Sequence, residues 1–191
     1  MSTADRPAAT LTPPTDSTGA VLRPMFRFGP ADAPRILEHL LALDADDRLL
    51  RFSHGIRDEG IAAYVATLDF ARDHVHGLGT AQGDIVALAH VAVRDGEVDF
   101  GLSVTATHRQ RGLGRALFNH VIALARLHGA GRIVCHSVSP AVLHMAAASG
   151  FRRPGGSHTA PLTLDLRAES HAGDDTHPCP APSAVSLAAA A

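Results

Sequence analysis

The chain has 191 residues, 46% of them hydrophobic, and a formal net charge of −2 at pH 7. This length and composition suffice to bury the core of one ordinary domain, which excludes a chain that is disordered throughout. The near-neutral charge lacks the basic footprint typical of nucleic-acid-binding proteins, so we expect no nucleic-acid partner.

The sequence carries no signal for a membrane or for a disulfide framework. The first residues, MSTADRPAATLTPP, lack the apolar core of a signal peptide, and no stretch approaches the roughly 20 apolar residues of a membrane span. The two cysteines, Cys135 and Cys179, lie in an apolar run and in a Pro-rich segment. Such isolated cysteines do not form a paired pattern. We therefore expect a cytoplasmic protein with no membrane partner.

Both ends of the chain are predicted to be disordered. Residues 1–19 and 168–191 are rich in small residues and Pro and contain few large apolar side chains. Such segments cannot bury enough apolar surface to offset the entropy of ordering. The composition therefore predicts a single domain between two tails, 1–19 and 168–191.

The first part of that domain predicts one strand followed by helices. VLRPMFRF (21–28) is typical of a strand, and Pro24 would suit an edge position. Residues 44–55 are interpreted as a turn or a short helix, and 57–70 as a second helix. The first helix is predicted from apolar residues that recur at helical spacing: Ile36, Leu37, Leu40, Leu41 and Leu43.

The middle of the chain changes to strand-like runs. Residues 74–81, 84–96 and 97–105 are rich in apolar residues and are joined by the turn signals AQGD and RDG. Short connections of this kind join antiparallel neighbours. We therefore predict an antiparallel meander of three strands.

The last part alternates helices and strands. Apolar spacing predicts a helix over 113–129, followed by a short buried strand over 132–138 and a helix over 140–149. Two closing strands are expected in FRRPG (151–155) and over 159–166. The whole order, β-α-α-β-β-β-α-β-α-β-β, predicts a mixed α/β arrangement built on one sheet.

The stretch HRQRGLGR (108–115) lies between a predicted strand and the longest predicted helix. Helix N-termini bind phosphates because their first N–H groups lack intrahelical partners, and glycines let a ligand approach the backbone. Arg109, Arg111 and Arg115 would add charge-assisted hydrogen bonds. The segment therefore predicts a binding site for a polyphosphate.

Two common nucleotide motifs do not fit this segment. The P-loop ends in Gly-Lys-Ser/Thr, and this chain contains no lysine. The dinucleotide fingerprint needs a third glycine, but Gly112 and Gly114 are followed by Leu117 at that position. What remains is Arg-x-x-Gly-x-Gly at 109–114.

This pattern resembles the Gln/Arg-x-x-Gly-x-Gly/Ala signature of the GNAT (GCN5-related) N-acetyltransferase superfamily. The resemblance covers roughly residues 20–166 and includes the order of elements and the Gly-Phe of AAASGF (146–151). Residues 46–52 and 139–151 are also similar in spacing to the acyltransferase domain of bacterial protein-lysine acetyltransferases. The resemblance implies a GNAT domain over 20–167, with an α/β fold whose mixed, mostly antiparallel sheet is flanked by helices.

The same resemblance implies acetyl-CoA as the cosubstrate. Backbone amides of residues 110–115 would hold its pyrophosphate, and the strand GLSV (101–104) would pair with the pantetheine arm. Ser139 stands where the family frequently has Asn at the start of the late helix, although it could act only as an N-cap. The implied cofactor-binding residues are Leu102, Ser103, Val104, Arg109, Gln110, Arg111, Gly112, Leu113, Gly114, Arg115 and Ser139.

Direct acetyl transfer to an amine needs a base, because an alkyl ammonium must lose a proton before it attacks. In EVDFGLSV (97–104) the acids Glu97 and Asp99 alternate with apolar residues, so both lie on one strand face. The family commonly carries a carboxylate on this strand, and the resemblance implies Asp99 as the base, with Glu97 second. The alternative is that both are solvated charges near a hairpin turn.

The other catalytic groups are less well defined. The family takes oxyanion donors from backbone N–H groups, here near Val104. Many members use a Tyr four residues before the Gly of Gly-Phe as the general acid, but this position is Ala146. The only tyrosine, Tyr64, is interpreted as a packing residue in the second helix. Water or the thiolate itself could replace the general acid.

Histidines and cysteines offer weaker candidates. His74 and His76 would share a strand face, and HPC (177–179) offers two soft ligands, but no four-ligand spacing appears, so we predict no metal site. His136 and His144 are candidates for proton transfer. Cys135 is interpreted as a small buried side chain rather than a nucleophile.

The sequence thus predicts an acetyl-CoA-dependent N-acetyltransferase that moves an acetyl group to a primary amine by direct attack on the thioester, with a protein lysine as the first acceptor considered. The alternatives are a small-molecule amine acetyltransferase and a non-catalytic acyl-CoA-binding regulatory module. A homodimer is compatible with each interpretation.

Overall fold

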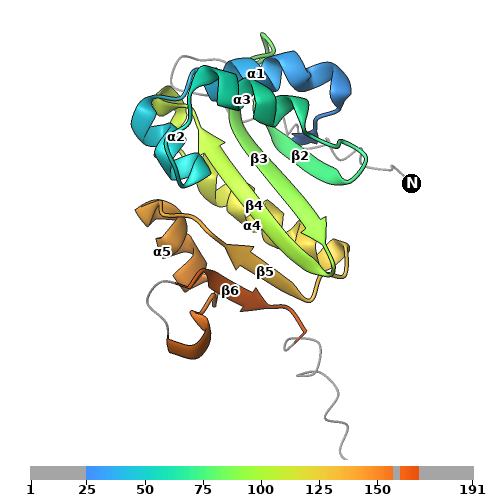
Figure 1. Cartoon of the computed structure of the whole chain (residues 1–191), viewed down its shortest axis with the longest axis vertical. Coiled ribbons are helices and arrows are strands. Elements are labelled where there is room, and N and C mark those ends of the chain that lie inside the picture. The colour runs from blue at the N-terminus through green and yellow to red at the C-terminus, as the bar shows by residue number, and fades with distance from the viewer. Residues whose placement is uncertain (1–24, 157–159, 168–191) are drawn as a thin grey trace, which may run out of the picture.

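Six strands form one sheet in the order β1-β2-β3-β4-β5-β6 in the computed structural model, which describes residues 25–156 and 160–167 (Figure 1). The pairing of β4 with β5 is parallel, and every other neighbouring pair is antiparallel. The strands are β1 (Phe26–Arg27), β2 (Asp73–Gly79), β3 (Ile85–Arg94), β4 (Glu97–Val104), β5 (Arg132–Cys135) and β6 (Leu162–Asp165).

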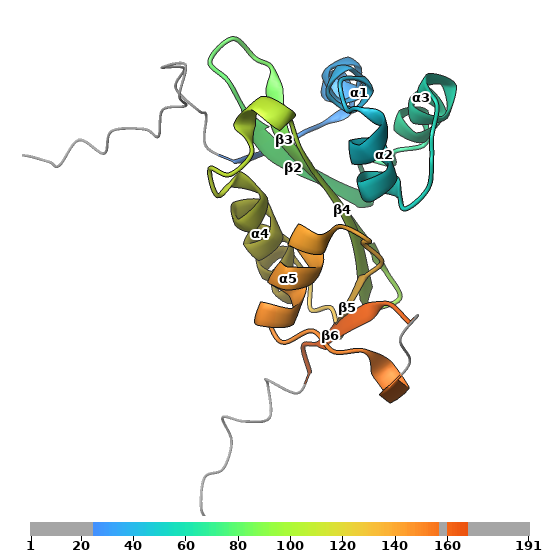
Figure 2. The same ribbon diagram turned by 90° about the vertical axis from the view of Figure 1, so that its left-hand side faces the viewer.

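Helices cover both faces of this sheet, as Figure 2 shows. One face carries α1 (Ala33–Leu41), α2 (Ala45–Phe52) and α3 (Asp58–Ala66), and the other carries α4 (Leu113–Leu127) and α5 (Pro140–Ala148). The predicted α/β class, with a mostly antiparallel sheet flanked by helices, is confirmed. The three-stranded meander is confirmed as β2, β3 and β4.

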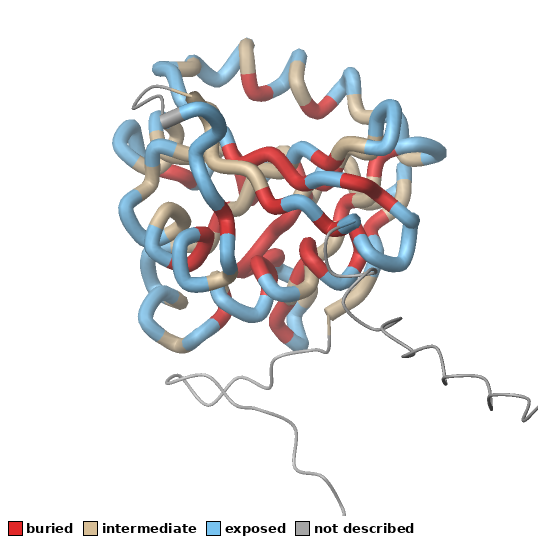
Figure 3. Tube along the Cα trace, turned by 90° about the horizontal axis from the view of Figure 1, so that it is seen from below, coloured by how far each residue is buried: buried red, intermediate tan, exposed pale blue. Residues whose placement is uncertain are grey.

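The sheet has an apolar core on each face, since helices cover both faces and the side chains of β3 are buried on both sides. On β3, Ala89 and Val91 pack into the cluster beneath α4, whereas Leu88 packs into the cluster beneath α1 and α3. The buried residues therefore gather along the centre of the molecule (Figure 3). The strand that borders the candidate site, β4, packs against the cluster beneath α4 through Val98, Phe100 and Leu102.

The segment between α1 and α3 forms a helix rather than a turn. Asp44 caps α2, since its Oδ1 accepts a hydrogen bond from the backbone N–H of Asp47 at 2.8 Å. The helix ends at Phe52, and its C-cap residue, Ser53, adopts a left-handed φ of 62°. The helix predicted over 57–70 is shorter than expected and ends at Ala66.

Among the described residues of the C-terminal part there is one closing strand, β6, so the prediction of a strand over 151–155 is wrong. Residues 151–155 make only a single bridge, Arg152 to Thr163, before a short helical turn at Pro154–Gly156. Pro154 has no N–H with which to extend a ladder, and Gly155 turns the chain with a φ of +63°. The strand predicted over 132–138 ends at Cys135.

Several predicted features fall outside the described residues. These are the two tails, the first residues of the strand expected over 21–28, the start of the one expected over 159–166, and the HPC triplet at 177–179. Among the residues described, no helix combines the length and apolar character needed to span a bilayer. The domain limits, the cytoplasmic location and the homodimer stay predictions.

Candidate active site

The sheet opens between β4 and β5. The two strands pair only over residues 97–99 and 132–134, and within the described residues the rest of β4 pairs with β3 alone. A cleft of about 850 Å³ occupies this opening. Its lining includes residues of α2 and α3 from one face and of α4 and α5 from the other. Two ligands that enter from opposite faces of the sheet can therefore meet at β4.

The glycine-rich segment forms one wall of this cleft. Gln110 and Gly112 adopt positive φ values of 59° and 79°, and Gly112 is the N-cap of α4. A Cβ atom added to Gly112 would meet nothing within 4 Å, so the backbone faces open space. The first N–H groups of the 15-residue α4 lack intrahelical partners and carry the positive end of the helix dipole. The loop therefore fits a pyrophosphate, as the sequence predicts.

The three arginines of this segment occupy different surroundings. Arg109 lines the cleft and forms an ion pair with Asp47 on α2. Arg111 donates from Nη2 to the carbonyl of Thr107 at 2.7 Å and is not part of the described cleft lining. Arg115 is exposed on the first turn of α4 and lines the cleft. Only Arg109 and Arg115 of the three are therefore placed to meet a ligand there.

The strand expected to pair with pantetheine also borders the cleft. Leu102 and Val104 pack toward the α4 core, whereas the side chain of Ser103 is buried on the α1 face. The predicted cofactor-binding residues that line the cleft are Leu102, Ser103, Val104, Arg109, Gln110, Gly112, Leu113, Gly114, Arg115 and Ser139.

Ser103 belongs to a buried hydrogen-bonded chain with His39 of α1. The Nδ1 atom of His39 lies 2.8 Å from the carbonyl oxygen of Ile85, which can only accept, so Nδ1 carries the proton. Nε2 of His39 then accepts from the Ser103 hydroxyl at 2.8 Å. Burial lowers the pKa of His39 to about 4, so the ring is neutral at pH 7. These two hydrogen bonds of His39 connect α1 to β3 and β4 next to the cleft.

The two candidate acids differ in position. Asp99 is exposed, lines the cleft, and stands at the last residue of the β4–β5 pairing. Its Oδ1 accepts from the backbone N–H of Phe100 at 2.7 Å. Glu97 lies outside the cleft lining, and its Oε2 accepts from Nε of Arg132 at 2.9 Å. Asp99 is therefore the acid that can reach a ligand in the cleft.

Arg51, Tyr64 and His90 form the wall on the α2 side, which sequence reasoning missed. Nη2 of Arg51 donates to the Tyr64 oxygen at 2.8 Å, and the Tyr64 oxygen lies 2.6 Å from Nδ1 of His90. Tyr64 also packs edge-on against Phe52, so its packing role is only part of its contribution. Burial, followed by the charge of Arg51, lowers the pKa of His90. The one signal in the sequence was a lone histidine within the apolar run IVALAHVAV.

The remaining candidates are placed as follows. His136 is exposed and lines the cleft, whereas His144 is exposed on α5 away from its lining. Cys135 is 2% exposed, and burial raises the pKa of its thiol, which disfavours the thiolate. In the described ranges, no group of three or more His, Cys, Asp or Glu side chains is arranged to hold a metal ion.

Two departures from the family pattern lie at α5, one at its N-cap and one within the helix. Ser139 occupies the N-cap position and lines the cleft, but its side chain makes no capping hydrogen bond. Ala146 is fully buried in the core, so this position supplies no general acid.

Comparison with known proteins identifies the family. The family model described as Acetyltransferase (GNAT) family matches residues 37–151, which is more than half of the chain. The chain therefore belongs to the GNAT acetyltransferase family. As a member, it is an N-acetyltransferase that uses acetyl-CoA as its acyl donor. No curated protein sequence matches the chain.

Solved structures of this family share the fold. The GNAT domain of PAT from Streptomyces lividans is 19% identical, with a TM-score of 0.59 over 78% of this chain and 93% of that chain. A GCN5-related N-acetyltransferase from Kribbella flavida is 19% identical, with a TM-score of 0.55 over 76% and 98%. The PaiA N-acetyltransferase of Thermoplasma acidophilum, solved with coenzyme A, is 9% identical, with a TM-score of 0.52 over 74% and 96%.

Proposed function

We propose that the chain binds acetyl-CoA in the opening between β4 and β5 and transfers the acetyl group directly to a primary amine that enters from the α2 side. One observation carries this proposal: a single cleft includes the loop before α4, the free edge of β4 and Asp99. Because the donor and acceptor walls lie on opposite faces of the sheet, both substrates can bind at once. No covalent enzyme intermediate is needed, and the buried Cys135 is not required as a nucleophile.

The donor is held by backbone groups in this proposal. The N–H groups of residues 110–115 bind the pyrophosphate, and residues 101–104 of β4 align the pantetheine arm. Acetyl-CoA supplies an acetyl group activated as a thioester. Two features of Gly112 support this assignment: its positive φ and the open space where a side chain would lie. A phosphate needs close approach to the backbone, and both features allow it.

Asp99 takes the proton from the attacking amine. Its place on the cleft wall, at the point where β5 leaves β4, supports this role, whereas Glu97 is engaged with Arg132 outside the cleft. Backbone N–H groups of β4 near Val104 that point away from β3 are the proposed donors to the oxyanion. A protein lysine and a small-molecule amine are the two acceptor classes that the sequence leaves open.

Acetyl transfer is tested by following the release of the coenzyme A thiol from acetyl-CoA with a panel of primary amines. The panel includes lysine-containing peptides and small amines, and the Asp99→Asn variant runs in parallel. Amine-dependent release that depends on Asp99 would support the proposal. Binding of acetyl-CoA with no turnover on any amine would favour the non-catalytic regulatory module instead.

A further inference from the structure

We propose that the acceptor is a small primary amine that carries a carboxylate, and that the guanidinium of Arg51 binds this carboxylate. The inference rests on the proposed function, because it assigns the acceptor class of the same cleft. The observations that carry it are the charge, the surroundings and the spacing of Arg51.

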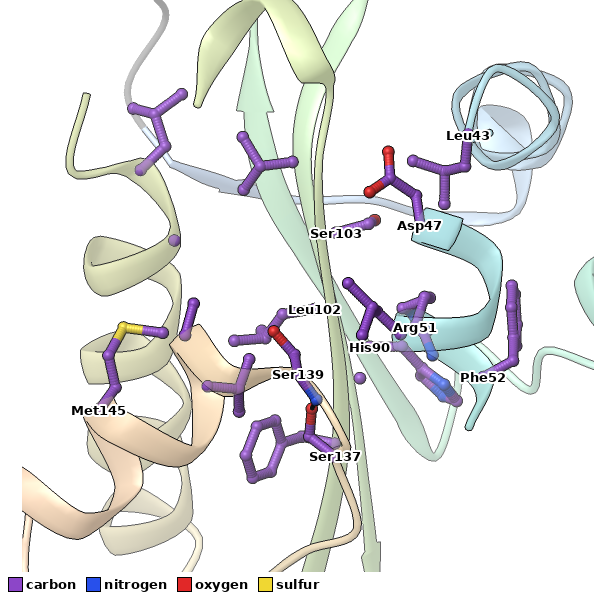
Figure 4. Close-up of a pocket in the computed structure, with 18 of the residues that line it drawn as sticks. Leu43, Asp47, Arg51, Phe52, His90, Leu102, Ser103, Ser137, Ser139 and Met145 are labelled. Atoms are coloured by element: carbon purple, nitrogen blue, oxygen red, sulfur yellow. Dashed lines mark hydrogen bonds between the residues drawn. The ribbon is translucent and has the colours of Figure 1, made fainter. Parts of the chain in front are cut away.

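Arg51 presents its guanidinium to the acceptor side of the cleft. The group lies over the ring of Phe52 at 4.9 Å and over that of Tyr64 at 5.5 Å, and it rests against the backbone of Gly101. Figure 4 places Arg51 and His90 together on the α2 side of β4, opposite Met145 of α5. The guanidinium thus lies between two aromatic rings and β4, in the lining of the cleft.

The charge of Arg51 has no counter-ion in the part of the chain that the structure describes. No carboxylate there lies within ion-pair distance of its guanidinium, and its buried Nε atom makes no hydrogen bond. Arg109, by contrast, is paired with Asp47. A partly buried cation without a counter-ion is costly, and an anionic ligand would offset that cost. This end of the cleft is therefore complementary to a negative group.

The position of Arg51 is fixed before any ligand binds. Tyr64 accepts from Nη2 of Arg51 and is itself hydrogen-bonded to His90. Nε2 of His90 lies 3.4 Å from Oδ2 of Asp73, whose Oδ1 accepts from Arg94 at 2.7 Å. Groups that are positioned in advance lose little entropy when they bind a substrate. Tyr64 and His90 act here as positioning residues for the guanidinium.

The spacing selects a short amino acid rather than a lysine side chain. Asp99 and Gly101 are two residues apart on the same strand face, a separation of about 7 Å. An acceptor whose amine meets Asp99 can therefore place a carboxylate at Arg51 if only a few carbons join the two groups. A lysine side chain within a protein carries no anionic group near its ammonium.

A matched panel of acceptors tests this inference. Glycine, β-alanine and 4-aminobutyrate are compared with ethylamine, propylamine and butylamine, which carry a methyl group in place of the carboxylate. We expect the carboxylated member of the best pair to have a kcat/KM at least about tenfold higher, because charge-assisted hydrogen bonds are worth roughly 10- to 100-fold in affinity. Equal rates for the two members of every pair would overturn the inference.

Variants show whether Arg51 is responsible. Arg51→Gln should bring the ratio within each pair to about one, and Arg51→Lys should restore part of it, because a lysine keeps the charge but not the planar fork. Arg57→Gln is the matched control, since Arg57 is exposed and lies outside the cleft lining. An unchanged ratio in Arg51→Gln would overturn the inference.

Binding is measured without turnover by the NMR signal of the arginine Nε–H groups, with Arg51→Gln used to assign the Arg51 resonance. The probes are 4-aminobutyrate and butylamine in the presence of coenzyme A. A shift with 4-aminobutyrate alone supports the inference even if no product forms, a result that would count only against the proposed function. Acetylation of alkylamines with no shift of the Arg51 signal would leave the proposed function standing and overturn the inference.

Discussion

The guanidinium of Arg51 lies against the α-carbon of Gly101, where a side chain would overlap with it. Gly101→Ala should therefore push the guanidinium aside while leaving the fold intact, because the displaced atoms are the end of a flexible side chain. We expect kcat/KM for a carboxylated amine to fall by about tenfold or more as the charge-assisted bond is lost. Steady-state kinetics and a thermal melt measure the two effects. Gly55→Ala is the control, since a Cβ there would meet nothing within 4 Å; equal kinetics in both variants would contradict the prediction.

Replacing the acid on the cleft wall should slow the chemical step. Asp99→Asn is expected to lower kcat by about 10²- to 10⁴-fold, the usual contribution of a general base, with little change in acetyl-CoA affinity. The same change at the other acid, Glu97→Gln, distinguishes the two candidates. Glu97 accepts a hydrogen bond from Arg132 and lies outside the cleft lining. A larger loss of kcat in Glu97→Gln than in Asp99→Asn would reverse the assignment.

The buried His39 should make stability depend on pH. Its pKa is lowered from 6.5 to about 4, so the unfolded chain binds a proton in this range and the folded chain does not. The free energy of unfolding should then decrease as pH falls from about 6.5 to about 4, by up to about 3 kcal/mol, and level off below. Urea unfolding of wild type and His39→Gln at several pH values isolates this contribution. Parallel pH curves for the two proteins would rule it out.

Gly77 allows β2 to approach its neighbours closely. A Cβ atom there would overlap with the backbone oxygen of Ala87 on β3 and would lie 2.8 Å from the ring of Phe28. Gly77→Ala should therefore destabilise the fold by about 1–3 kcal/mol, the usual cost of overpacking a core. Gly29→Ala, where a Cβ would meet nothing within 4 Å, should change the midpoint of urea unfolding much less. Equal midpoints for the two variants would contradict this interpretation.

The elements that form the proposed donor side were predictable because their signals are local. The meander follows from alternation and turn residues within one stretch of chain, and the glycine-rich segment sits directly between β4 and α4. Alternation also places Glu97 and Asp99 on one face. It does not predict which acid reaches the cleft, because that depends on where β5, about 35 residues later in the chain, separates from β4.

The proposed acceptor side could not be predicted from local patterns. Arg51, Tyr64 and His90 come from α2, α3 and β3, and they meet only because α1–α3 pack on one face of the sheet. Tyr64 fits a packing role on its own helix, and its hydrogen bonds to the other two residues appear only in three dimensions. The prediction of a second closing strand failed for a local reason. Pro154 and Gly155 form a turn there, so the strand cannot continue.

Binding of the coenzyme at the glycine-rich loop is measured by a calorimetric titration of acetyl-CoA into the purified protein. The wild type is compared with Gly112→Asp/Gly114→Asp and with Gly112→Asn/Gly114→Asn, which has side chains of the same size but no negative charge. We predict micromolar binding to the wild type, loss of binding in the Asp variant through repulsion of the phosphates, and weaker but measurable binding in the Asn variant. No binding to the folded wild type, or equal binding to the Asp variant, would contradict the assignment of this loop as the coenzyme A site.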